Sequence, residues 1–95
     1  MKSCRLSEIR STARFYDELA RQLDFPAHFG RNLDALWDVL VNDVEGPLEI
    51  VWEDTRLSRE AMCGDYVKLA ALLEEVAKER GDIVLKLLPS GKQKR

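Results

Sequence analysis

Two aspartates, Asp34 and Asp38, lie four residues apart in the segment NLDALWDVL, which spans residues 32–40. In a helix this spacing places both carboxylates on the same side, where like charges repel by about 0.2–0.5 kcal/mol. Seven acidic residues and no lysine or arginine occur between Asn32 and Thr55, so no cation in that stretch relieves the repulsion. A region whose charges all have the same sign attracts partners of the opposite sign. The pair therefore indicates either a binding surface for a basic partner or a plain solvated helix face.

Catalysis is a weaker interpretation of these carboxylates. Paired carboxylates can act as acid and base, but helical spacing does not give them two different environments. With His28, the sole histidine, they could hold a metal ion, although a catalytic zinc site takes more nitrogen or sulfur ligands. The sequence contains no G-x-S-x-G, glycine-rich phosphate loop or C-x-x-C motif. We therefore expect no enzyme, no metal site and no cofactor.

Composition indicates one acidic domain of 95 residues, without a membrane span or signal peptide. Its net charge is −2, but without the tail SGKQKR the balance is 12 basic against 17 acidic residues, or −5. This balance argues against direct binding of nucleic acid, which needs a basic face. Cys4 and Cys63 show no disulfide or metal spacing and are expected to be reduced thiols of a cytoplasmic protein. Residues 89–95 are expected to be a disordered basic tail.

Hydrophobic periodicity predicts one α/β domain over residues 1–88 with the element order βααβααβ. Strands are expected at 3–6, 48–53 and 82–88, and helices at 12–23, 32–41, 58–64 and 66–80. Ser11 and Asn32 are suitable N-caps, and Gly81 ends the last helix. The segment DIVLKLL at 82–88 is typical of a strand that is covered on both faces. Because helices separate the strands, we expect a three-stranded parallel sheet packed with about four helices.

The predicted helix at 32–41 carries an apolar stripe bordered by the two carboxylates. At 100° per residue, the stripe consists of Leu33, Leu36, Trp37, Leu40, Val41 and Val44. An aromatic residue beside charges at the edge of a core resembles a partner-binding patch. Asp34 also has a structural explanation, because the helix dipole stabilises a carboxylate in the first turn and Arg31 could pair with it. Asp38 lies beyond that turn and has no local cation.

The run FPAHFGRNLDALWDVL, followed by VEGPLEIVWE, resembles the barstar family of ribonuclease inhibitors over about residues 1–88. The resemblance implies an inhibitor that plugs the active site of a small basic microbial ribonuclease with the helix at 32–41 and its preceding loop. Asp38 would occupy the position of substrate phosphate, and Asp34 would meet a basic residue at the rim of the cleft. Glu75 would make a peripheral charged contact. The other contacts implied are His28, Phe29, Asn32, Leu33, Ala35, Trp37, Val41 and Asp43.

Five positions depart from the family pattern. The family inhibitor carries tyrosine at His28, glutamate at Arg31, cysteine at Val39, threonine at Val41 and tryptophan at Asp43. The loss of two aromatic contacts favours a different cognate ribonuclease or weaker binding to the best-known one. His28 would add pH dependence to binding between about pH 5 and 8.

Two functions stay open ahead of the least favoured one, a small enzyme or metal protein that uses His28, Asp34 and Asp38. One is an intracellular ribonuclease inhibitor, such as an immunity protein for a ribonuclease toxin. The other is an acidic module for a different basic protein, such as a DNase or a regulatory factor. In both cases we expect the free chain to be a monomer, because an acidic face would repel a copy of itself.

Overall fold

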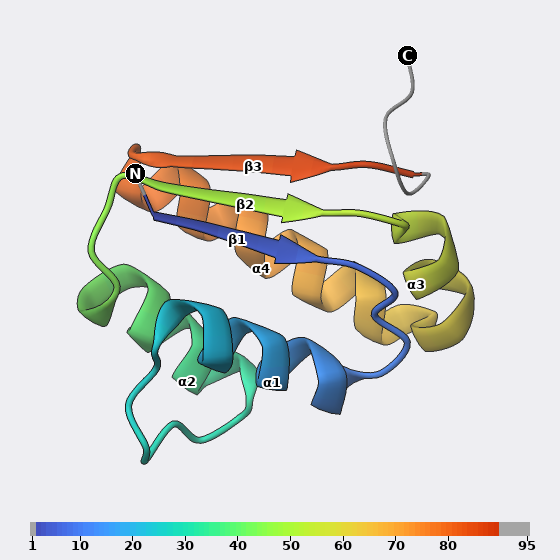
Figure 1. Cartoon of the computed structure of the whole chain (residues 1–95), viewed down its shortest axis with the longest axis horizontal. Coiled ribbons are helices and arrows are strands. Elements are labelled where there is room, and N and C mark those ends of the chain that lie inside the picture. The colour runs from blue at the N-terminus through green and yellow to red at the C-terminus, as the bar shows by residue number, and fades with distance from the viewer. Residues whose placement is uncertain (1, 90–95) are drawn as a thin grey trace.

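A computed structural model of the chain describes residues 2–89, which form one sheet and the helices that pack on it (Figure 1). In chain order the elements are β1 (Lys2–Leu6), α1 (Thr12–Leu23), α2 (Leu33–Asp38), the π-helical turn η1 (Val39–Asp43), β2 (Leu48–Trp52), α3 (Thr55–Met62), α4 (Gly64–Arg80) and β3 (Ile83–Leu87). The strands pair in parallel in the order β1-β2-β3, with Cys4, Ile50 and Leu85 in register. The predicted α/β fold and its element order are confirmed.

α1, α2 and α4 lie on one face of the sheet, and α3 lies at the end where the strands finish (Figure 1). Each crossover between parallel strands is right-handed as a rule, and both crossovers advance in the same direction, so both place their helices on the same side. The outer face is open: Val84 is 44% exposed and Lys86 is exposed. The prediction that residues 82–88 form a strand covered on both faces is therefore wrong. β3 is an edge strand whose alternate side chains face solvent.

The core joins the inner face of the sheet to α1 and α4. The rings of Phe15 and Tyr66 each lie 5.0 Å from that of the fully buried Trp52. The Trp52 indole N–H donates to the Ser58 hydroxyl at 3.1 Å, and this hydroxyl donates to the carbonyl of Ile9 at 2.7 Å. The one indole of the core thus has a partner, as a buried donor requires.

The third and fourth helices both begin earlier than predicted. The third helix begins at Thr55 rather than residue 58, directly after Asp54, whose φ of 59° turns the chain out of β2. The fourth begins at Gly64 rather than residue 66, because the positive φ of Cys63 ends α3 and lets α4 start at the next residue. Gly81 ends α4 at a φ of 80°, where a glycine has no steric cost. The expected tail lies outside the described residues, apart from Pro89.

Candidate partner-binding surface

The first turn of α2 presents Asp34 to solvent, and the next turn presents Asp38. Asn32 caps the helix by accepting the backbone N–H of Ala35 at 2.8 Å. This cap fixes Asp34 at the second helical position, where the helix dipole favours its charge. Within residues 2–89, neither aspartate forms an ion pair. Two exposed carboxylates on one side of a short helix are thus free to meet cations from outside.

The helix that carries these aspartates changes form after Asp38. The prediction of one helix to residue 41 is wrong, because α2 ends at Asp38 and η1 continues to Asp43. The N–H of Val44 donates to the carbonyl of Val39 at 3.1 Å, a bond that spans five residues and widens the turn. Val39, which the α-helical projection left outside the stripe, is buried, while Leu33 is 37% exposed. Trp37 and Val41 remain half-buried, at the edge that the sequence predicted.

Arg80, at the end of α4, holds the wide turn in place. Its Nη1 donates to the carbonyls of Leu40 at 2.9 Å and Val44 at 2.7 Å, and its Nη2 meets Asp82 at 2.9 Å. The side chain is 11% exposed. Carbonyls at a helix end lack intrahelical donors, and a charged donor satisfies them strongly. No local pattern in the sequence indicates this role of Arg80, because the two carbonyls that it binds lie 36 and 40 residues away along the chain.

A shallow apolar groove between α2 and α4 brings Glu75 beside Leu33 and Trp37. The groove has a volume of about 400 Å³, and its other lining residues are Lys68, Ala71 and Leu72. Sequence reasoning missed these three. Their signal was the spacing of Lys68 and Leu72 from Glu75, seven and three residues, which places them on the same face of a helix. Three of the predicted contact residues therefore share one continuous surface.

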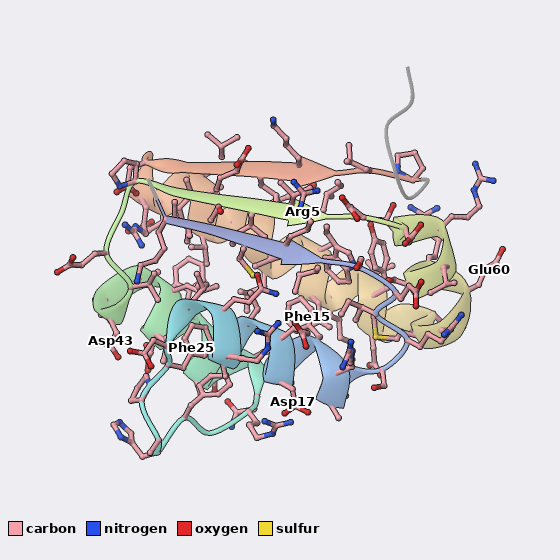
Figure 2. The ribbon with its side chains drawn as sticks, in the orientation of Figure 1. Arg5, Phe15, Asp17, Phe25, Asp43 and Glu60 are labelled. Atoms are coloured by element: carbon pink, nitrogen blue, oxygen red, sulfur yellow. The ribbon has the colours of Figure 1, made fainter. Side chains whose placement is uncertain are left out.

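A second hollow lies at the opposite end of this helical segment and brings together His28 and Asp43. It encloses about 450 Å³, and Phe25, Val39 and Val44 form part of its lining. Figure 2 shows Asp43 and Phe25 at the same end of the molecule. The predicted contact Phe29 does not line this hollow, and its ring packs 4.9 Å from Phe25 and 5.7 Å from Tyr16. Phe29 thus supports the loop that carries His28.

Arg31 does not pair with Asp34. Its Nη2 instead contacts Asp17 at 2.7 Å and the carbonyl of Ala13 at 3.2 Å, both on α1. Arg31 and Asp34 nevertheless line one hollow, together with Tyr16 and Asp65. Burial raises the pKa of Tyr16, the charge of Asp65 raises it further, and the charge of Arg31 opposes them. The local pairing of Arg31 with Asp34 that the sequence allowed is replaced by a contact with α1.

The candidate metal ligands do not lie together in the part of the chain that the structure describes. Within residues 2–89, no three histidine, cysteine, aspartate or glutamate side chains lie close enough to hold an ion, so His28, Asp34 and Asp38 do not form such a group. In the same part of the chain, no helix combines the length and the apolar character needed to cross a membrane.

Comparisons with known proteins identify the family of this chain. A family model described as "Barstar (barnase inhibitor)" matches residues 1–88. A protein of Bacillus subtilis (strain 168) described as "Putative ribonuclease inhibitor YrdF" is 38% identical over 68 residues, which cover 70% of this chain and 74% of that protein. Proteins of this family are inhibitors rather than enzymes. The chain, with its acidic helix mounted beside a three-stranded parallel sheet, therefore belongs to the barstar family of ribonuclease inhibitors.

Proposed function

We propose that this protein inhibits a small basic ribonuclease by inserting α2 and the preceding loop into its active site. The observation that carries the proposal is the exposure of Asp34 and Asp38 without an internal ion pair among residues 2–89. Two carboxylates side by side repel each other slightly in the free protein. Charge-assisted hydrogen bonds in a cleft from which water is excluded stabilise the complex by more than this repulsion costs.

Asp38 is the central residue of this proposal. It takes the place of substrate phosphate and meets the arginine, lysine and histidine groups of the nuclease, while Asp34 meets a cation at the rim. The groove at Leu33, Trp37 and Glu75 lies on one side of these aspartates, and the hollow of His28 and Asp43 lies at the end of the segment. Inhibition then needs no chemistry and no cofactor. A host that makes such a nuclease would keep the inhibitor in its cytoplasm as an immunity protein or antitoxin.

Titration into the assay of a barnase-type ribonuclease tests the proposal. Wild type should inhibit stoichiometrically, and Asp38→Ala should lose about 2–5 kcal/mol of binding free energy, roughly a thirtyfold to few-thousandfold rise in Kd. Glu60→Ala is the matched control, because Glu60 is an exposed carboxylate on α3, at the other end of the molecule from Asp43 (Figure 2).

Thermal unfolding of the same variants separates binding from folding. Asp38 makes no ion pair within residues 2–89, so its replacement by alanine should leave the Tm unchanged or slightly raised. Equal inhibition by wild type and Asp38→Ala would contradict the proposed role of Asp38.

A second candidate keeps the surface and changes the partner. His28 and Asp43 share a hollow where the family pattern carries two aromatic residues, which favours a nuclease with a more basic complementary surface. Under this alternative, barnase-type enzymes are not inhibited and another basic nuclease is.

A further inference from the structure

We infer that Asp17 is a positioning residue for the proposed inhibitory surface, because it holds the guanidinium of Arg31 on α1 and thereby leaves Asp34 free for the partner. Arg31 is the nearest cation in sequence to Asp34, three residues before it. At that spacing an arginine and an aspartate can pair across the start of a helix. The inference rests on the proposed function, since it explains how one carboxylate of that surface stays available.

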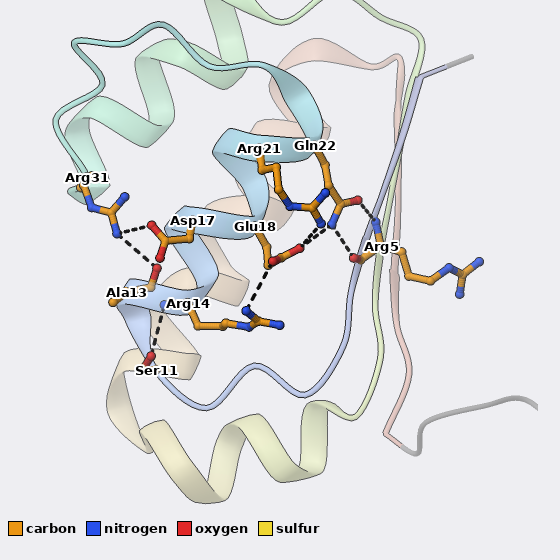
Figure 3. A network of polar contacts seen from close by, with 9 residues as sticks. All are labelled: Arg5, Ser11, Ala13, Arg14, Asp17, Glu18, Arg21, Gln22 and Arg31. Atoms are coloured by element: carbon orange, nitrogen blue, oxygen red, sulfur yellow. Dashed lines mark hydrogen bonds and ion pairs between the residues drawn. The ribbon is translucent and has the colours of Figure 1, made fainter.

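Two acceptors on α1 hold Arg31 away from α2 (Figure 3). Its Nη2 contacts the Asp17 carboxylate at 2.7 Å and the Ala13 carbonyl at 3.2 Å. Ala13 and Asp17 lie one helical turn apart, so a single guanidinium bridges both. Arg31 itself has a left-handed φ of 56°, which reverses the chain just before the cap at Asn32. The Arg31 guanidinium thus lies against α1 and not against the first turn of α2.

Asp17 is available to Arg31 because the cations of α1 are engaged elsewhere. Arg21 contacts Glu18 at 2.6 Å, and Arg14 contacts the other carboxylate oxygen of Glu18 at 3.6 Å (Figure 3). Two arginines of the same helix therefore converge on one glutamate. Within residues 2–89, the ion pair of Asp17 is the one with Arg31. Glu18 is therefore occupied by arginines of its own helix, and Asp17 is left to bind Arg31 of the loop.

Without the Asp17 carboxylate, Arg31 has other acids within its surroundings. Arg31, Asp34 and Asp65 line one hollow, so Asp34 and Asp65 are the nearby acids toward which a released guanidinium could turn. On Asp34 it would neutralise a carboxylate that the partner needs and would place a cation toward a basic surface. Both effects weaken binding. Asp17 therefore acts on the partner through Arg31, and it does not need to touch the partner itself.

The test compares wild type with Asp17→Asn, Arg31→Gln and the double variant, in binding to a barnase-type ribonuclease. Asp17→Asn should raise Kd about two- to fivefold, the size expected of one exposed ion pair. Arg31→Gln should bind at least as tightly as wild type, and the double variant should match Arg31→Gln. A merely structural role would make both single variants weaker and would give no rescue. Glu60→Gln is the control for loss of one negative charge far from α2.

Two binding results would overturn the inference: Asp17→Asn indistinguishable from Glu60→Gln, or a double variant as weak as Asp17→Asn. A crystal structure of Asp17→Asn tests, without any partner, whether Asp17 determines the position of the Arg31 guanidinium. The Arg31 guanidinium on Asp34 supports the inference, and one that stays on the Ala13 carbonyl overturns it. Wild type that fails to inhibit would count against the proposed function alone, because the position of Arg31 is read independently.

Discussion

Single residues of this protein differ sharply in what burial does to them, and Cys4 is the clearest case. Burial raises the pKa of its thiol from 9.0 to about 12, the charge of Glu18 adds to the rise, and Arg21 opposes it. The thiol is 1% exposed, whereas Cys63, between α3 and α4, is exposed. Since the thiolate is the nucleophile, Cys4 should be unreactive in the folded protein at neutral pH.

The raised pKa of Cys4 predicts a loss of stability in alkali. The thiol releases its proton near pH 9 in the unfolded chain but keeps it in the folded protein. The contribution of Cys4 to the free energy of unfolding is therefore complete below pH 9 and is lost as pH rises toward about 12. Each pH unit in that window should remove up to about 1.4 kcal/mol. Urea unfolding of wild type and Cys4→Ala from pH 8 to 10.5 measures this. Parallel pH profiles of the two proteins would contradict the prediction.

At the same scale, the sequence predicted the exposed carboxylates but not the partners of the arginines. Asp34 and Asp38 are identified by a local pattern of cap, spacing and missing cations, which a linear chain displays. Arg31 and Arg80 depend on α1 and η1, and no local pattern names a contact 14 or 40 residues away. The local pairing considered for Arg31 does not form, because α1 offers its guanidinium two acceptors, the Asp17 carboxylate and the Ala13 carbonyl.

At the scale of the element, the α2–η1 segment shows where periodicity fails. A projection at 100° per residue assumes one helical form, and the five-residue bond from Val44 to Val39 breaks that assumption. Val39 and Val44 then lie one wide turn apart and are both buried. The caps at Ser11, Asn32 and Gly81 were predictable, because cap chemistry is local.

Arg80 should decide the stability of this segment. Arg80→Lys keeps the charge but cannot reach the Leu40 and Val44 carbonyls and the Asp82 carboxylate together, so we expect a loss of about 1.5–3 kcal/mol in the free energy of unfolding. The control is Asp82→Asn, which removes one half-exposed ion pair and should cost less than about 1 kcal/mol. Urea unfolding measures both, and equal losses would rule out the bonds to η1 as the cause.

At the scale of the whole molecule, topology explains what hydrophobicity alone did not. The apolar run at 82–88 predicted a strand covered on both faces, but consecutive parallel strands with right-handed crossovers leave one face open. The open face is protected by charge: Lys86 pairs with Glu49 at 3.3 Å, and Arg5 pairs with Glu53. Val51 is buried among them. The fold class followed from element order, whereas the exposed face required the direction of each crossover.

The charge of the whole domain predicts how partners arrive. With 17 acidic against 12 basic residues outside the tail, long-range attraction should accelerate the encounter with a basic nuclease. The association rate constant should fall at least about tenfold between 20 and 500 mM salt, and the dissociation rate constant should change much less. Stopped-flow mixing measures both constants. An association rate that does not depend on salt would contradict electrostatic steering.

The two tryptophans give the molecule two separate optical reporters. Trp52 is fully buried and hydrogen-bonded to Ser58, so its fluorescence emission should change when the core opens. Trp37 is half-buried in the groove beside Glu75, so its emission should change when a partner covers that surface. Trp52→Phe and Trp37→Phe would each isolate one signal. Unfolding and binding can then be followed separately, each in its own single-tryptophan variant, without any label attached to the protein.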